Sequence, residues 1–554
     1  MIHAEIDGER ISVSMPIVYK EVIKRVPGAR WKDGAWTVPL SFAACLQLRA
    51  EFGELLTVGP ELVEWANAYL TYKMTITATK EGALIAPVDE ALYLPQKIGA
   101  NWLATVGQGL LADEMRAGKT PQVIEALELI GKEALPALVV CTNTTKWVWA
   151  AEFEKWAPGL TVEVVGGTPS QRSKQIASGA DVVIANWDLL RYHSRLAAYG
   201  SIELSDKEKK RGALNEVGFQ TVVADEAHKA VDPKAKQTRA FWFLAHEARF
   251  RYALTGTPVI NRPSDLFSIM HALAPEEYPV KSSWVERYCL SGQGRYGFEI
   301  WGLRPDRQQE LFQFLDPRML RRTLREVRPY MPDRLPTETR YVDLPTAQAK
   351  AYNTLKKEML LEVDSEILVE SSPLTLAGRL RQAAAGTLVV EDGRVIALKE
   401  PSVKIDALLE AIEEGDSEPL VVFMASRKLC ELCEKVLERK KISYVALHGG
   451  IDPQLRAANV ARFQVGAAQV ALCTTGVAAE GITLNRASRT LFLQRDWSAA
   501  KNLQAESRTD GRPGADPLQT IVHVVRGTIE ERVLSVDGDK LGYLQEVLRD
   551  ELRT

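Results

Sequence analysis

The fold of this chain is decided by two stretches, Ala112-Asp113-Glu114-Met115-Arg116-Ala117-Gly118-Lys119-Thr120 and Asp225-Glu226-Ala227-His228. Each stretch directly follows an apolar run, which for the second is Thr221-Val222-Val223-Ala224. Such a run predicts a buried strand, and open α/β sheets bind their ligands where parallel strands end. We therefore expect both stretches at the carboxyl edge of one sheet.

The first stretch has the chemistry of a phosphate-binding loop. Backbone N–H groups around Gly118 and the ammonium of Lys119 suit the β- and γ-phosphates, and the hydroxyl of Thr120 suits Mg²⁺. In the second stretch, Asp225 is expected to hold Mg²⁺ and Glu226 to polarise the attacking water. The residues thus predict an ATP hydrolase with ATP and Mg²⁺ as cofactors, in which Lys119, Asp225 and Glu226 are catalytic and Thr120 and Asp225 bind the metal.

Composition sets limits on this hypothesis. The 554 residues are enough for three or four domains, and 69 Lys and Arg against 72 Asp and Glu give a net charge of −3. A protein with this net charge does not attract nucleic acid over its whole surface, so any contacts with nucleic acid must be local. No apolar run is long enough for a membrane span and the start is unlike a signal peptide, so we expect an intracellular protein without a membrane partner, cytoplasmic in a bacterium or its virus and nuclear in a eukaryote.

Six cysteines do not describe a disulfide framework in so long a chain. Cys430 and Cys433 form a Cys-x-x-Cys, but both lie on an apolar helical stripe with no second ligand pair at zinc spacing. We expect packing rather than a metal.

The order of strand and helix patterns predicts an α/β protein with two parallel-sheet lobes. Two Asp-Gly turns, Asp7-Gly8 and Asp33-Gly34, indicate hairpins in a small N-terminal α+β module. Strand runs alternating with helical patterns follow twice, separated by a mainly helical, charged region. The expected domains are 1–68 (module), 69–275 (first lobe), 276–400 (helical protrusion and linker) and 401–554 (second lobe with a closing helix).

Only the first lobe has a phosphate loop, so the second lobe is expected to complete the ATP site with cations. The run Gln504-Ala505-Glu506-Ser507-Arg508-Thr509-Asp510-Gly511-Arg512 places two arginines close together after a predicted strand. Arg508 and Arg512 are the candidates for arginine fingers.

With these motifs in place, the chain resembles the Swi/Snf family of helicase-like DNA translocases in superfamily two. The segments that match the family occur in the family's order, at 112–120, 141–156, 186–190, 225–228, 254–258, 421–427, 448–450, 474–484, 504–512 and 527–532. The resemblance implies two RecA-like lobes. Segments at 287–301 and 319–336 look like the annealing-helicase branch, and the hairpin with Trp31 and Trp36 is similar to that branch's HARP module.

The resemblance and the residue chemistry together assign further site residues. Nucleotide contacts are expected from Gln96, Arg116, Ala117, Gly118, Lys119, Thr120, Gly481 and Gln504. Polar groups at predicted strand ends can hold DNA phosphates without reading bases, and the candidates are Thr144, Lys146, Asn186, Trp187, Arg427, His448, Thr474 and Thr475. Coupling of the γ-phosphate to the DNA-binding parts is expected from His228, Thr255, Gly256 and Thr257.

Two departures from the family pattern stand out. Arg116 occupies a position where the family usually has glycine. Its side chain could add a cation near the phosphates or constrain the loop, but the favoured expectation is that it points outward without effect. Three residues rather than two separate Arg508 from Arg512. In addition, Arg318, Arg321, Arg322, Arg325 and Arg328 fit one face of a helix, which could brace the lobes or touch DNA.

The leading hypothesis is a DNA-stimulated ATPase and translocase that remodels or anneals double-stranded or forked DNA or displaces bound protein, with a role in DNA repair. Single-stranded-DNA-binding or replication proteins are further expected partners, and the chain is expected to be a monomer. A DEAH-box RNA helicase is the same-class alternative. A nucleotide-gated DNA-binding scaffold without efficient turnover is the alternative from another class.

Overall fold

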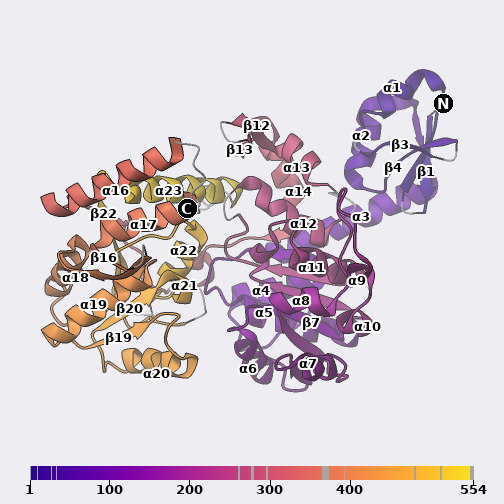
Figure 1. Ribbon diagram of the computed structural model, residues 1–554. Coiled ribbons are helices and arrows are strands. Elements are labelled where there is room, and N and C mark those ends of the chain that lie inside the picture. Colours follow the sequence, from indigo (N-terminus) through magenta and orange to yellow (C-terminus); the bar gives the residue numbers. More distant parts are fainter. Residues whose placement is uncertain are drawn as a thin grey trace. The chain divides into compact units, whose positions relative to one another are not determined.

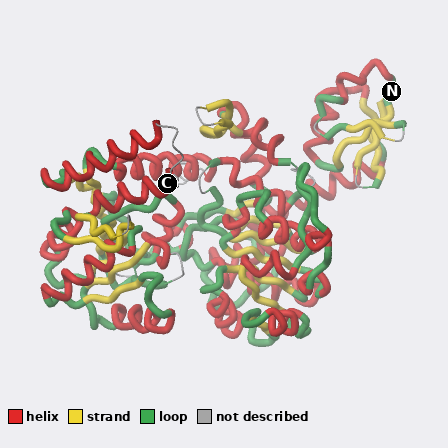
Figure 2. Tube along the Cα trace, in the orientation of Figure 1, coloured by secondary structure: helices red, strands yellow, loops and turns green. Residues whose placement is uncertain are grey.

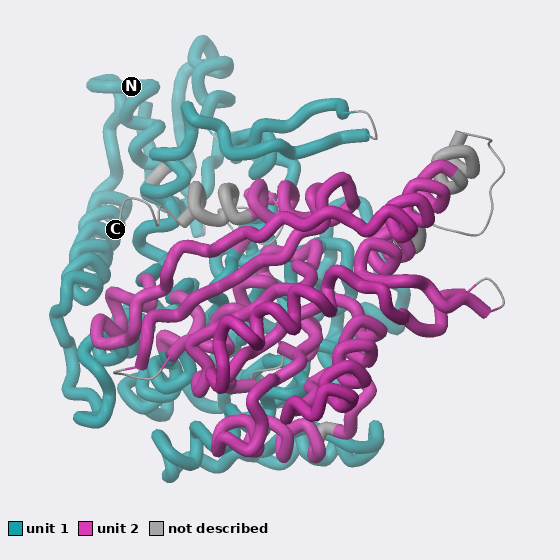
Figure 3. The backbone as a smooth tube through the Cα atoms, turned by 90° about the vertical axis from the view of Figure 1, so that its left-hand side faces the viewer, with its two compact units in different colours: residues 1–113, 118–258, 264–322 teal, residues 114–117, 259–263, 323–554 magenta. Residues whose placement is uncertain are grey.

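The computed structural model describes all residues except 1, 9, 27, 33, 260–261, 276–279, 295–296, 365–372, 392–393, 479–481, 512–514 and 549–554. The chain divides into two compact units (Figure 3). Unit 1 comprises Met1–Asp113, Gly118–Pro258 and Ser264–Arg322. Unit 2 comprises Glu114–Ala117, Val259–Pro263 and Thr323–Thr554.

The N-terminal module of unit 1 is a five-stranded sheet in the order β3-β4-β2-β1-β5 (Figure 1). Its strands are β1 (Ile2–Asp7), β2 (Arg10–Ser14), β3 (Arg30–Lys32), β4 (Ala35–Pro39) and β5 (Leu56–Val58), and its main helices are α1 (Lys20–Ile23), α2 (Phe42–Phe52) and α3 (Pro60–Lys80). The β1–β2 and β3–β4 pairs are antiparallel, which confirms both predicted hairpins. Trp36 packs against the module's core, whereas Trp31 is 62% exposed.

The main sheet of unit 1 has seven parallel strands in the order β14-β6-β11-β10-β7-β9-β8. The strands are β6 (Gln108–Leu111), β7 (Ala137–Cys141), β8 (Val162–Val164), β9 (Val182–Asn186), β10 (Thr221–Asp225), β11 (Phe250–Leu254) and β14 (Met319–Leu320). Helices border the strands (Figure 2), among them α4 (Leu94–Val106), α5 (Lys119–Ile130), α6 (Lys146–Trp156), α7 (Pro169–Ile176), α8 (Trp187–His193), α11 (Lys236–Glu247) and α12 (Leu266–Leu273). Every residue of β7 and β9 is buried, as expected for a sheet covered on both faces.

The region after this lobe contains strands as well as helices. It holds α13 (Lys281–Tyr288), the hairpin of β12 (Cys289–Gly294) and β13 (Gly297–Leu303), and α14 (Gln308–Leu315). The expected arginine-rich helix over 318–328 is wrong, because Met319 and Leu320 pair with Leu110 and Leu111 of β6 and only α15 (Leu324–Val327) is helical. Pairing with β6 buries Leu320, which is 6% exposed.

Unit 2 is built on a six-stranded parallel sheet in the order β15-β22-β21-β18-β20-β19. The strands are β15 (Glu338–Val342), β18 (Leu420–Met424), β19 (Tyr444–Leu447), β20 (Val470–Thr474), β21 (Arg489–Phe492) and β22 (Gln519–Val525). The helices include α16 (Thr346–Asp364), α17 (Pro373–Ala385), α18 (Val403–Glu414), α19 (Arg427–Lys440), α20 (Pro453–Gln464), α21 (Thr475–Ala478), α22 (Ala499–Ser507) and α23 (Ile529–Leu548). The two parallel sheets confirm the predicted fold class.

Two hydrophobic clusters sandwich the unit 2 sheet. Alternate residues of β18 serve them, with Val422 and Met424 in one cluster and Val421 and Phe423 in the other. Cys430 and Cys433 are buried in the first cluster, so the prediction that they pack is confirmed. Among the described residues, no helix is long and apolar enough to cross a bilayer.

A buried ion pair ties the start of α23 to α18. The ammonium of Lys404 lies 2.6 Å from Glu530 Oε2 and donates to the carbonyl of His523 at 2.9 Å, and Lys404 is fully buried. Burial lowers the pKa of Lys404, and the charge of Glu530 opposes that shift. The pair therefore depends on both partners.

Replacing Glu530 with glutamine should destabilise unit 2, because it leaves the Lys404 charge buried without its counter-charge. Removal of one partner of a buried pair typically costs about 3–5 kcal/mol. Differential scanning calorimetry of Glu530→Gln should show a lower melting temperature, while the exposed neighbour variant Glu531→Gln should melt like the parent. Equal melting temperatures for all three proteins would contradict this assignment.

Candidate functional site

The phosphate-binding loop enters α5 through a left-handed glycine. Gly118 has a φ of 77° and is the N-cap of α5, so Lys119 and Thr120 occupy the first helical turn, where backbone N–H groups are available to an anion. A Cβ at Gly118 would lie 2.2 Å from Nε2 of Gln96. Glycine thus suits this position both for its backbone angle and for the close approach of Gln96, a predicted nucleotide contact.

The side chain of Lys119 is held by the backbone of the phosphate-binding loop. Its Nζ donates to the carbonyl of Asp113 at 2.8 Å. Burial lowers the pKa of Lys119, and the charges of Glu226, Asp113 and Asp225 oppose that shift. The lysine therefore lies within the electrostatic reach of the two motif carboxylates, as a phosphate-binding cation should.

Asp225 and Glu226 lie where β10 ends, as predicted. Glu226 has a φ of 51°, and its N–H donates to Oδ1 of Asp225 at 3.0 Å. Burial raises the pKa of Asp225 to about 6, with the charge of Glu226 as the next cause. An acidic pair of this kind favours a cation in its vicinity.

Two tryptophans hold Asp225 in place, and the sequence did not assign this role to either. The indole of Trp149, on α6, donates to Oδ2 of Asp225 at 2.9 Å. The indole of Trp187, at the start of α8, donates to the carbonyl of Asp225 at 2.9 Å. Trp187 is 3% exposed, so the structure gives this predicted DNA contact a positioning role inside the lobe.

The predicted coupling residues contact one another between the ends of β10 and β11. Nδ1 of His228 lies 2.9 Å from Oγ1 of Thr255 and 3.2 Å from Oε2 of Glu226. The N–H of Thr257 donates to the same Thr255 hydroxyl at 3.1 Å. These contacts join Glu226, through His228, to the loop that contains Thr255, Gly256 and Thr257.

Arg321 and Arg322 are parts of the site whose position was not foreseen. Arg322 forms a two-pronged bond to Asp113, from Nε to Oδ1 at 3.0 Å and from NH2 to Oδ2 at 2.6 Å. Gln122 on α5 accepts from the same guanidinium at 2.9 Å and donates to the carbonyl of Gly118 at 3.0 Å. Arg321 donates to the carbonyl of Ala112 at 2.8 Å. Both arginines brace the phosphate loop.

The predicted DNA contacts of unit 1 separate into exposed and buried residues. Thr144 is exposed just beyond the end of β7, which suits a phosphate contact. Lys146 is 7% exposed and its ammonium donates to the carbonyl of Val165 at 2.8 Å, so it is turned inward. Asn186 is 9% exposed at the N-cap of α8.

In unit 2, the predicted DNA contacts lie at the carboxyl ends of β18, β19 and β20. Arg427 is exposed and pairs with Glu431 at 2.8 Å, one turn along α19. Thr474 and Thr475 are 8% and 1% exposed, and Oγ1 of Thr475 lies 3.4 Å from Asp496.

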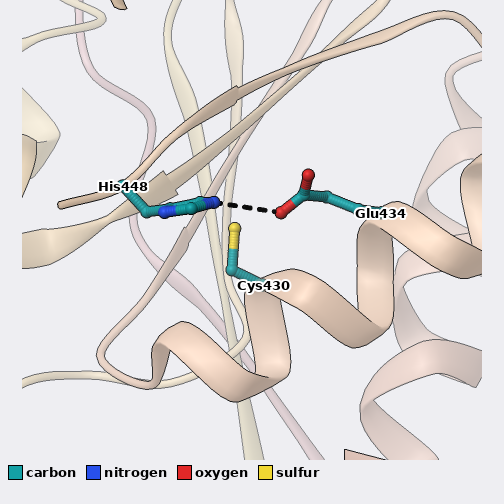
Figure 4. A group of neighbouring side chains, drawn as sticks. All are labelled: Cys430, Glu434 and His448. Atoms are coloured by element: carbon teal, nitrogen blue, oxygen red, sulfur yellow. Dashed lines mark ion pairs between the residues drawn. The ribbon is translucent and has the colours of Figure 1, made fainter. Parts of the chain in front are cut away.

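His448 joins Cys430 and Glu434 in a cluster that has metal-binding residue types (Figure 4). Its Nε2 lies 3.2 Å from Oε1 of Glu434, while its Nδ1 accepts the N–H of Gly450 at 3.1 Å. That acceptor role places the imidazole proton on Nε2, whereas a ligating histidine normally donates from its second nitrogen. The cluster is therefore better explained as a hydrogen-bonded pair beside a packed thiol than as a metal site.

The segment after α22 contains the predicted finger Arg508. Its Nε donates to the carbonyl of Ala478 at 2.6 Å, and Gln504 is 5% exposed on the preceding helix. Gly481 and Arg512 lie outside the described residues.

The prediction that Arg116 points outward is wrong. Arg116 has a φ of 65°, and its NH1 faces the carbonyls of Ser507, Arg508 and Asp510 at 3.1, 3.3 and 3.0 Å, all within unit 2. Burial lowers the pKa of its guanidinium. The sequence offered one signal for this role, the arginine at a position where the family usually has glycine.

The raised pKa of Asp225 gives a test of the site in the absence of Mg²⁺ and nucleotide. The pKa of this carboxyl is higher in the folded chain than in the unfolded chain, where it is about 3.9. Such a carboxyl destabilises the fold as the pH rises from the unfolded-state pKa through the folded-state pKa. Asp225→Asn should therefore raise the melting temperature at pH 8, and the gain should shrink toward pH 4.

Thermal unfolding at pH 4, 6 and 8 measures this effect, with exposed Asp188→Asn as the matched control. A melting temperature for Asp225→Asn at pH 8 that is equal to or below that of the parent would contradict the assignment.

Comparison with known proteins agrees with this geometry. The family model described as SNF2-related domain matches residues 95–386, more than half of the chain, and the helicase conserved C-terminal domain matches residues 403–514. The human protein "DNA annealing helicase and endonuclease ZRANB3" is 26% identical over 457 residues, which cover 80% of this chain and 40% of that protein. A Xenopus tropicalis "SWI/SNF-related matrix-associated actin-dependent regulator of chromatin subfamily A-like protein 1" is 25% identical over 461 residues, covering 81% and 44%.

The chain thus spans about two fifths of the length of these relatives. Among solved structures, "Sulfolobus solfataricus SWI2/SNF2 ATPase core in complex with dsDNA" is 23% identical, with a TM-score of 0.40, over 84% of this chain and 99% of that one. The match to the SNF2-related domain over more than half of the chain confirms the predicted family. The chain belongs to the family of proteins with an SNF2-related domain, followed by a helicase C-terminal domain.

Proposed function

We propose that this protein is a DNA-dependent ATPase that translocates on double-stranded or forked DNA. The observation that carries the proposal is the convergence, within unit 1, of Lys119, Asp225 and Glu226 on one edge of a parallel sheet, next to the His228–Thr255 contact. These residues supply a phosphate-binding cation, a metal-binding carboxylate and a group that can orient water. Family membership makes double-stranded DNA the favoured activator.

The residues present fit Mg²⁺. Asp225 is a carboxylate whose pKa is raised by burial and by a second carboxylate, and Thr120 offers a hydroxyl in the first turn of α5. Hydroxyl and carboxylate oxygens are ligands that Mg²⁺ prefers. When bound, Mg²⁺ supplies positive charge to the phosphates, while Lys119 binds them and Glu226 orients the water.

The two alternatives are less well supported. The SNF2-related match favours a DNA translocase over a DEAH-box RNA helicase. A nucleotide-gated scaffold would use Lys119 to bind the phosphates, but without turnover it has no use for Glu226 beside it, which orients water.

ATP turnover with and without nucleic acid tests the proposal. Duplex or forked DNA should raise kcat at least about tenfold at a stated salt concentration, and single-stranded RNA should not. Lys119→Ala should abolish turnover, while Lys132→Ala, an exposed lysine after α5, should retain the stimulation. Equal turnover with and without DNA, or stronger stimulation by RNA, would contradict the function.

The N-terminal module favours forked over plain duplex DNA as the substrate. Trp31 is 62% exposed on β3 between the exposed cations Arg30 and Lys32, and its ring contacts Trp36 edge to face at 5.6 Å. An exposed ring between cations suits stacking on an unpaired base. Annealing is likewise an activity named for one relative.

Trp31→Ala should weaken binding to a fork with single-stranded arms about 5- to 100-fold, the usual contribution of one stacked base. Binding to blunt duplex should change little. Fluorescence anisotropy with both DNAs measures the difference, and Val18→Ala, which alters another exposed apolar side chain of the module, serves as the control. An equal loss on both DNAs would assign Trp31 to general packing.

A further inference from the structure

Arg116 places its charge at the end of the helix that precedes the predicted arginine finger. α22 ends at Ser507, and the carbonyls of Ser507, Arg508 and Asp510 all face NH1 of Arg116 within 3.3 Å. The last carbonyls of a helix have no partner within the helix and carry the negative end of its dipole. A guanidinium there donates to these carbonyls and offsets that negative charge, while the carbonyls of Ser507 and Arg508 also accept the N–H groups of Asp510 and Leu484 at 3.3 and 2.8 Å.

The same turn is held from a second side. Asp510 is 4% exposed on its side chain and accepts from Nε of Arg334 at 3.0 Å. Burial raises the pKa of Asp510, and the charges of Arg334 and Arg116 oppose that shift. Arg334 thus contacts a side chain of the turn, whereas Arg116 contacts its backbone, including the carbonyl of Arg508, which it shares with the N–H of Leu484.

The backbone of Arg116 is as constrained as its side chain. Its positive φ of 65° is costly for a residue with a Cβ, which is why glycine suits this position. The neighbouring Glu114 accepts the N–H of Leu324 at 2.5 Å, again within unit 2. In the chain, only Ala117 separates Arg116 from Gly118, where the phosphate-binding backbone begins.

We propose that Arg116 is a positioning residue that couples nucleotide binding at Gly118–Lys119 to the order of the Ser507–Asp510 turn, and so to the position of Arg508. The proposal rests on the proposed function, because it needs a nucleotide at the loop. The strained backbone transmits a change at Gly118 to the guanidinium, and the guanidinium transmits it to three carbonyls of the turn. The turn that contains Arg508 is then ordered only while the loop is occupied.

Arg116→Gly is the decisive variant, because glycine removes the guanidinium and also accepts the positive φ without strain. Arg116→Lys keeps the positive charge but loses the planar guanidinium, whose N–H groups face the carbonyls of the turn. Lys441→Gly is the matched control, since Lys441 is an exposed basic residue of unit 2 with a φ of 58° at the end of α19. All three proteins are expected to fold.

Hydrogen exchange of peptides spanning 507–511 tests the coupling with a non-hydrolysable ATP analogue and Mg²⁺. The analogue should slow exchange about tenfold in the parent and in Lys441→Gly, and should have no effect in Arg116→Gly at saturating concentration. Arg116→Lys should be intermediate. Equal protection in the parent and Arg116→Gly, or no protection in either, would overturn the proposal even in a protein that does not turn over ATP.

Turnover separates this proposal from the proposed function. DNA stimulation of the parent tests the function, whereas the variants test the coupling. Arg116→Gly should lower kcat about 10- to 100-fold with KM for ATP changed less than threefold, and Arg116→Gly combined with Arg508→Ala should be no slower than Arg508→Ala alone. Additive losses in the double variant would show that Arg116 does not act through Arg508.

Discussion

The ion pair between Arg322 and Asp113 is the interaction on which the nucleotide site depends. Asp113 is fully buried at the start of the phosphate loop, so its charge requires a partner. That partner comes from a residue 209 positions later, delivered by β14, the edge strand beside β6. The loop geometry, the position of Lys119 and the packing of Gln122 all follow from this pairing.

The other charged groups of the unit 1 site are arranged to suit a charged ligand. Burial and the charge of Glu226 raise the pKa of Asp225, which means that they disfavour its ionised form. Two indoles fix the orientation of this residue. Lys119 is half-buried within electrostatic reach of these carboxylates. These groups make the fold less stable at this edge of the sheet when no ligand is bound. The charge of a bound ligand can offset that loss of stability.

Sequence patterns were sufficient where chemistry is local. Asp225 and Glu226 lie at the end of β10, and Lys119 follows β6 after a short loop, so an apolar run and the loop behind it fix their place at the sheet edge. Contacts between distant segments could not be foreseen in this way. Lys146 looked like a surface cation but reaches Val165, because nothing in the spacing shows which way a strand-end lysine turns.

The arginines after α14 illustrate the same limit. Their spacing fits one face of a helix, yet two apolar residues between them complete a sheet, and this pairing decides which cations are buried. For Arg116 the family pattern indicated an unusual backbone position but not its carbonyl partners, which lie almost four hundred residues away in the chain. Long-range pairing, rather than local propensity, separates the predicted part of the site from the unforeseen part.

Nucleotide affinity after loss of the Arg322 charge tests the central claim most directly. Isothermal titration calorimetry of Mg²⁺–ATP analogue binding should show at least a tenfold weaker dissociation constant for Arg322→Met, because Asp113 loses its buried partner and the loop its brace. The exposed neighbour variant Arg325→Met should bind like the parent. Unchanged affinity in Arg322→Met, with the fold intact, would contradict the account.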